Sequence, residues 1–205
     1  MPINLTKPTK DSVPESILFL DPSVNNCGFS VYKVCHFSSE LGYKSSLLDF
    51  GVIKSDYKEK TSMKIRQVLR MSSDIFSNHA CSHIVIEVPP QTIYGIDTMT
   101  PDMIVARAQS VFKTVAVSHV LYHDSVSRGR SAMMVLPVQW EPGKSERGGL
   151  AIKAYNVEEA NRIIKKNNFS SRLTAGGREE NAADAVVMGY RLISAIIQKK
   201  QFKED

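Results

Sequence analysis

The sequence has little of what would place it among disulfide-rich, zinc-binding or membrane proteins. It has three cysteines, Cys27, Cys35 and Cys81, in 205 residues, and their spacing has no metal-ligand pairing. We therefore expect reduced, structural thiols. No apolar run approaches the roughly 20 residues that span a bilayer, and the polar start MPINLTKPTKDSVPES lacks the apolar region of a signal peptide. These absences predict a soluble intracellular protein without a membrane partner.

The charge balance and the length further restrict the class of protein to which this chain can belong. Lysine and arginine number 26 against 21 acidic residues, which gives a formal net charge of +5 and a pI near 9.1. A basic surface favours a polyanionic partner, because Lys and Arg displace counterions from phosphates. With 42% hydrophobic residues the chain can bury one good core, so we expect one domain. It contains no internal repeat or low-complexity block.

The order of apolar patterns predicts an α/β sheet covered by helices. The runs SILFLD, CGFSVYKV and SLLDFGVIKS are β-branched and aromatic and predict three neighbouring antiparallel strands. HIVIEVPP and AMMVLPV predict further strands, and helical spacing predicts helices over 58–78, 101–123, 151–166 and 181–199. We expect residues 1–16 to form a loose arm, 17–198 the domain and 199–205 a solvated tail.

Three acidic residues stand where an apolar element ends or begins. Asp21 ends the first strand, Glu87 lies near the end of HIVIEV, and Asp184 begins the last helix. Each is ordinary alone, because Asp favours turns and helix starts and a strand-end Glu can face solvent. Burying Asp21 or Glu87 among these apolar neighbours is costly without a cation or a hydrogen-bonding partner. Hard oxygen ligands suit Mg²⁺ or Mn²⁺, so the set predicts a metal site.

The segments ILFLDPSVNNCGFSVY, HIVIEV and NAADAVVMGYRL resemble, in order and spacing, the three acidic motifs of the RuvC-like Holliday junction resolvases. This family belongs to the RNase H-like superfamily. LPVQW and KAYNVEEANRII are also similar to segments of its phage-type members, and the resemblance covers about residues 17–195. It implies an RNase H-like mixed five-stranded sheet flanked by helices, and cleavage of four-way DNA junctions by a homodimer in a bacterial or phage-infected cytoplasm.

The resemblance also assigns roles to the acids. Asp21, Glu87 and Asp184 match the family's metal-binding acids, with Mg²⁺ or Mn²⁺ as cofactor, two ions per site. Asn181 departs from the family, which usually carries His or Asp three residues before the last acid. An amide oxygen is a poorer ligand and cannot act as a base, so activity is expected to be reduced or metal-selective. Glu180 compensates only if the loop allows it.

Several further residues are candidates for contact with DNA. Lys153 matches the family's phosphate-contacting lysine, which would stabilise developing negative charge; a solvated surface lysine is the less favoured alternative. Tyr94 lies where family members probe unstacked bases, although a tyrosine that caps the core is about as plausible. Lys144, Arg147 and Arg178 could line the path of the duplex; for each one a merely solvated position is the commoner case.

Other functions and the partner surface stay open on the sequence. A related RNase H-like nuclease for other branched or flapped DNA would share the acids, and a DNA-binding relative weakened at Asn181 would share the fold. Actin-like ATPases have a similar phosphate loop but need a second domain. Paired nicking predicts a homodimer. Its contact is expected on the helix 101–123, through Ile104, Val105, Val111 and Val115, although these residues could equally belong to the core.

Overall fold

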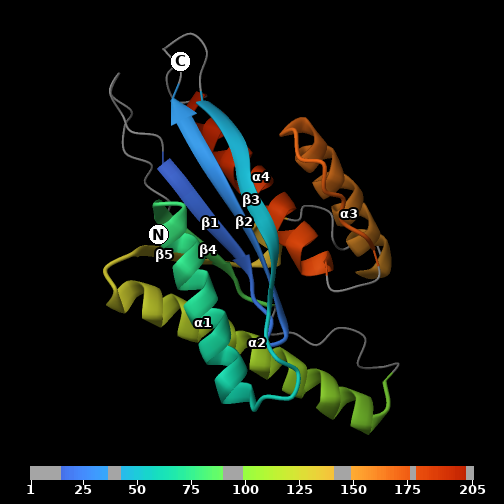
Figure 1. The fold of residues 1–205 in the computed structure, drawn as a ribbon. Coiled ribbons are helices and arrows are strands. Elements are labelled where there is room, and N and C mark those ends of the chain that lie inside the picture. The colour runs from blue at the N-terminus through green and yellow to red at the C-terminus, as the bar shows by residue number, and fades with distance from the viewer. Residues whose placement is uncertain (1–14, 37–42, 90–98, 141–148, 176–178, 202–205) are drawn as a thin grey trace.

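The computed structural model describes residues 15–36, 43–89, 99–140, 149–175 and 179–201 (Figure 1). Its strands are β1 (Glu15–Asp21), β2 (Asn26–His36), β3 (Tyr43–Lys54), β4 (Cys81–Glu87) and β5 (Ser131–Val135). Its α-helices are α1 (Thr61–Asn78), α2 (Pro101–Ser127), α3 (Gly149–Lys166) and α4 (Glu180–Gln201), and a 3-10 turn, η2, covers Pro137–Gln139. Among the described residues, no helix has the length and hydropathy that a membrane span requires.

The strands form one mixed sheet in the order β3-β2-β1-β4-β5. β1, β2 and β3 pair antiparallel, and β1, β4 and β5 pair parallel. β1 is therefore the central strand, and its run from Ile17 to Leu20 is fully buried. A strand covered on both faces needs an unbroken apolar run, which explains ILFL. The predicted α/β fold, a mixed five-stranded sheet flanked by helices, is confirmed.

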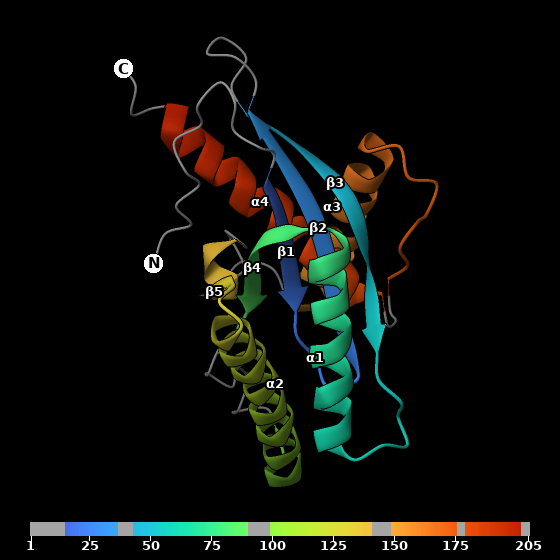
Figure 2. The ribbon, with the colours of Figure 1, turned by 60° about the vertical axis from the view of Figure 1, so that its left-hand side comes forward.

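Helices cover both faces of the sheet (Figure 2). Leu18 and Leu20 of β1 pack in the cluster that includes Val68 of α1 and Leu121 of α2. The alternate residues of β1 pack in a second cluster with α3 and α4. Period-two alternation thus divides β1 between the two helical layers. α4 lies on the sheet against β1, β2 and β3, and α3 packs on α4.

Small residues and two hydrogen bonds hold α4 close to β2. The Ser30 hydroxyl donates to the Ala185 carbonyl at 2.8 Å, and the Tyr32 hydroxyl donates to the Val186 carbonyl at 2.8 Å. A Cβ atom at Gly28 would lie 1.9 Å from the backbone oxygen of Asn181. One at Gly189 would lie 2.6 Å from the Tyr32 ring. Glycine at these positions allows a separation that no larger residue permits.

Several element bounds differ from those expected. β1 begins at Glu15, inside the expected arm, because Glu15 still pairs with Val34 of β2. α1 begins at Thr61 rather than at residue 58, and α4 runs to Gln201. α2 starts as expected, where the Thr100 side chain accepts a hydrogen bond from the Met103 amide. It continues past residue 123 to Ser127, because no helix-breaking residue intervenes.

The glycine contact gives a test of the α4 position. Gly28→Ala is expected to lower the free energy of unfolding by about 3 kcal/mol, because the new methyl group meets rigid backbone and overpacking of this kind is costly. Gly51→Ala is the matched control, because its Cβ would meet only the Phe29 ring, at 3.0 Å. Urea unfolding followed by circular dichroism measures both variants. Equal losses in the two would contradict a rigid contact at Gly28.

Candidate active site

Asp21 and Glu87 end neighbouring parallel strands. Leu20 of β1 pairs with Ile86 of β4, so Asp21 and Glu87 are the next residues along each strand. Phe19 and Val85, two positions earlier, both pack in the cluster beneath α3 and α4. Because strand side chains alternate with period two, both carboxylates are directed to that same face. The carboxyl ends of parallel strands are where α/β folds commonly bind ligands.

Asp184 comes to this face from the first turns of α4. Asn156 of α3 is 1% exposed, and its amide nitrogen donates to Oδ1 of Asp184 at 2.7 Å. A buried amide that donates to a carboxylate oxygen restricts the rotation of the carboxylate. α3 therefore orients Asp184, although α3 itself carries none of the three candidate acids Asp21, Glu87 and Asp184.

Lys153 adds a positive charge from the same helix. Its ammonium donates to Oε2 of Glu180 at 2.7 Å, in an ion pair between α3 and α4. Partial burial acts to lower the pKa of Lys153. The hydrogen bond and charge of Glu180, joined by the charges of Asp184 and Asp21, outweigh burial and raise the pKa above its ordinary value. The ammonium therefore lies in the field of acids from both β1 and α4.

Cys27 lies beside the acidic edge, by which we mean the edge of the sheet at which Asp21, Glu87 and Asp184 lie. It is not one of these candidate metal ligands. It is fully buried in the cluster under α1 and α2. Burial raises the pKa of the thiol far above its usual value, and the charge of Asp21 raises it further. Burial also raises the pKa of Cys81 to about 12. Both thiols are protonated near neutral pH, in agreement with the expected structural role.

Asn181 joins the start of α4 to the turn that follows Asp21. Its amide nitrogen donates to the backbone carbonyl of Asn26, at the first residue of β2. An amide coordinates a cation through its oxygen and not through its NH2 group, so this hydrogen bond does not use the potential ligand atom, Oδ1. The residue thus ties the strand that carries Asp21, through the β1–β2 turn, to the helix that carries Asp184.

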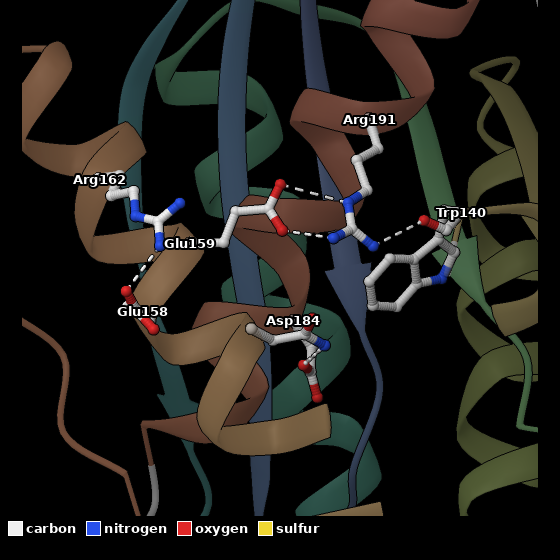
Figure 3. Close-up of polar contacts among 7 residues, drawn as sticks. Trp140, Glu158, Glu159, Arg162, Asp184 and Arg191 are labelled. Atoms are coloured by element: carbon white, nitrogen blue, oxygen red, sulfur yellow. Dashed lines mark hydrogen bonds and ion pairs between the residues drawn. The ribbon is translucent and has the colours of Figure 1, made fainter. Parts of the chain in front are cut away.

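A polar network fixes the two helices behind the site (Figure 3). Arg191 of α4 pairs with Glu159 of α3 and also donates to the Trp140 carbonyl at 3.2 Å. The Trp140 side chain is 2% exposed and packs in one cluster with Val157 of α3. This placement makes Trp140 a packing anchor rather than a base-stacking residue.

The donor chemistry of the acids fits a hard divalent cation, since carboxylate oxygens are the ligands that Mg²⁺ prefers. Within the described ranges, however, no group of three or more His, Cys, Asp or Glu side chains is arranged to hold a metal ion. The acids share one face without forming a ready-made three-ligand site. In this structure Glu180 pairs with Lys153, and Asp184 accepts the Asn156 amide.

Four candidates for DNA contact, Tyr94, Lys144, Arg147 and Arg178, lie outside the described residues. The histidines have structural contacts: His79 bonds Asp49 at 2.9 Å, and His119 stacks on His123. None of these histidines belongs to a metal cluster among the residues described.

Two site residues were missed on the sequence. Asn156 was not singled out, although it lies three positions after Lys153 and so shares a helix face with it. On the sequence Glu180 is only a substitute ligand, whereas the structure pairs it with Lys153. The i,i+3 spacing of Lys153 and Asn156 indicates that the two residues share a helix face, but it does not indicate their partners on α4.

The comparisons with known proteins rest on structure alone. No protein-family model matches the sequence, and neither does any curated protein. The RuvC structure of Thermus thermophilus is similar, with a TM-score of 0.55 and 15% identity over 91% of this chain and 96% of that chain. The T. thermophilus RuvC complex with a Holliday junction substrate gives a TM-score of 0.54 and 16% identity over the same shares. The chain thus has the RuvC-type RNase H-like fold.

The contact of Asn181 with Asn26 can be tested by stability. Asn181→Ala is expected to lower the free energy of unfolding by about 1 kcal/mol through the lost hydrogen bond, and Asn181→Asp by about 2 kcal/mol, because a carboxylate would then face the Asn26 carbonyl. Urea unfolding at neutral pH measures the order. An Asn181→Asp variant as stable as the wild type would show that the amide donates nothing of consequence.

Proposed function

We propose that this protein is a metal-dependent, structure-specific endodeoxyribonuclease that resolves four-way DNA junctions by paired symmetric nicks. The proposal starts from the RuvC-type fold, since one of the similar solved structures is a RuvC complex with a Holliday junction substrate. A shared fold alone does not assign an activity, so the activity has to be inferred from the residues of the site.

The observation that carries the proposal is the shared face of Asp21 and Glu87 at the ends of adjacent parallel strands. Asp184 approaches that face from α4. Buried apolar strands end in carboxylates at this edge, which a purely structural role does not require. Acids that converge at the carboxyl ends of strands form a cation-binding edge, which is the feature a phosphodiester hydrolase needs.

Asp21, Glu87 and Asp184 would hold Mg²⁺ or Mn²⁺, two ions per site. The bound ions would supply a nucleophilic water and stabilise the leaving oxygen. The chain itself contributes orientation and charge: Asn156 restrains the Asp184 carboxylate, and Lys153 offers an ammonium to a phosphate oxygen on which charge develops. Asn181 contributes its amide oxygen and holds the first turn of α4.

A second candidate is a catalytically weakened relative that binds branched DNA. It is favoured by the absence, within the described ranges, of a ready-made three-ligand group. Asn181 also favours it, because an amide stands where RuvC-like resolvases usually carry His or Asp. A nuclease for flapped or otherwise branched DNA shares every feature of the site, so substrate choice has to be measured.

Removing one carboxylate charge at a time gives the principal test. Asp21→Asn, Glu87→Gln and Asp184→Asn are each expected to lower cleavage of a labelled four-way junction by at least about a hundredfold, because each removes charge from the cation site. Junction affinity in a gel-shift assay should change little, since phosphate contacts remain.

Asp74→Asn on α1 is the matched control, because Asp74 is an exposed acid paired only with Arg70 along its own helix. Its cleavage rate should equal that of the wild type. The same reactions on a flap and on an RNA-DNA hybrid determine the substrate class. Full cleavage by all three site variants would exclude the proposed site, and junction binding without any cleavage by the wild type would favour the weakened relative.

A homodimer would supply the second active site that paired nicking needs, and α2 offers a surface for it. Every buried residue of this helix lies in its second half, from Val117 onward. In the first half Val105 and Phe112, seven positions apart and so on one face of the helix, are more than half exposed. Exposed apolar surface of this kind marks an interaction site. Of the residues expected there, Val105 is exposed, while Ile104, Val111 and Val115 are half-buried.

A charge on this face of α2 should break the dimer. Phe112, which is 72% exposed, can be replaced by Glu without a core penalty, and Phe112→Glu is expected to weaken self-association at least about tenfold. Tyr57→Glu is the control, because Tyr57 is 78% exposed outside α2. Light scattering at micromolar protein, with and without junction DNA, measures the mass. A wild-type monomer in both states would refute the paired mechanism.

A further inference from the structure

Lys153 occupies the side of the acidic edge that lies between α3 and α4. Its ammonium contacts Glu180 at 2.7 Å, and its side chain is 46% exposed. Asn156, one helical turn further along α3, contacts Asp184 at 2.7 Å. α3 therefore presents two polar groups to the acids of α4, one of them charged.

The acids around Lys153 come from separate elements. Glu180 and Asp184 belong to α4 and Asp21 to β1, and all three favour the charged form of the lysine. No three-ligand metal group exists among the described side chains in this arrangement. The ammonium thus supplies the positive charge that carboxylates at a partly buried edge require.

We propose that Lys153 is the resident counter-cation of the acidic edge and that a divalent cation binds there only by displacing it. The inference rests on the metal-dependent function proposed above. The ammonium contacts Glu180, which precedes Asp184 by four residues on α4. An ammonium and a divalent cation this near to one another repel, and each gains from the negative charge of the same group of acids. Displacement frees Lys153 from Glu180 and leaves the ammonium available to a phosphate oxygen. The same lysine thus balances the acids in the metal-free protein and contacts phosphate in the DNA-bound protein.

Competition predicts that removal of the ammonium tightens metal binding. We expect Lys153→Met to bind Mn²⁺ about tenfold more tightly than the wild type in the absence of DNA, because the competing charge is gone. Lys153→Gln keeps a hydrogen-bond donor toward Glu180 but no charge, and the same tightening there identifies charge as the cause. The electron paramagnetic resonance signal of free Mn²⁺ at fixed ionic strength measures the dissociation constants.

Lys166→Met is the matched control: it removes the same charge from an exposed position at the far end of α3, about 20 Å along the helix. Its Mn²⁺ affinity should equal that of the wild type. A second readout is the melting temperature without metal, which Lys153→Met should lower more than Lys166→Met, with a larger recovery on addition of Mn²⁺.

The outcomes separate this inference from the function on which it rests. If the wild type binds Mn²⁺ and Lys153→Met binds no more tightly than Lys166→Met, the displacement is overturned and the nuclease proposal stands. Weaker binding by Lys153→Met would also overturn it and would make Lys153 a residue that orients the acids. Absence of Mn²⁺ binding in every variant would overturn both proposals.

Discussion

The close approach of α4 to β2 is the constraint on which the site depends. Gly28 allows the backbone of Asn181 to lie against the strand, and the hydroxyls of Ser30 and Tyr32 bind carbonyls of the next turns. A strand and a helix held by main-chain contacts cannot slide relative to one another without breaking buried hydrogen bonds. The position of Asp184 relative to Asp21 follows from this contact rather than from the acids themselves.

The sheet supplies the other half of the geometry. β1 is covered on both faces, so its alternate side chains enter different helical layers, and the same alternation continues to its last residue. Parallel pairing with β4 carries Glu87 to the same edge and the same face as Asp21. An acidic residue at the end of a buried strand is then exposed to the layer of α3 and α4 without interrupting the core.

The sequence was sufficient for the parts of the structure that depend on local periodicity. Three neighbouring antiparallel strands followed from their short β-branched runs, and the acids were located because each ends or begins an apolar element. The mixed five-stranded sheet was implied by the resemblance to RuvC-like resolvases. The Lys153 to Glu180 and Asn156 to Asp184 contacts join residues 27 and 28 positions apart. They depend on how α3 crosses α4, which no local pattern encodes. The exposed side of α2 was similarly undetermined, because only packing decides which of its many apolar residues are covered.

An acidic edge has to be compatible with folding before any metal or DNA arrives. Carboxylates brought together by backbone contacts repel one another, and burial increases the cost. This chain offsets that cost with its own groups: the Asn156 amide on Asp184, the Lys153 ammonium on Glu180, and the positive end of α4 near Glu180 in its first turn. The same groups weaken the binding of a divalent cation, since carboxylates whose charge is already neutralised gain less interaction energy from a cation. At this edge, groups that stabilise the metal-free fold therefore lower the affinity for a divalent cation. A lysine with a flexible, half-exposed side chain can stabilise the metal-free fold and still move away when a cation binds.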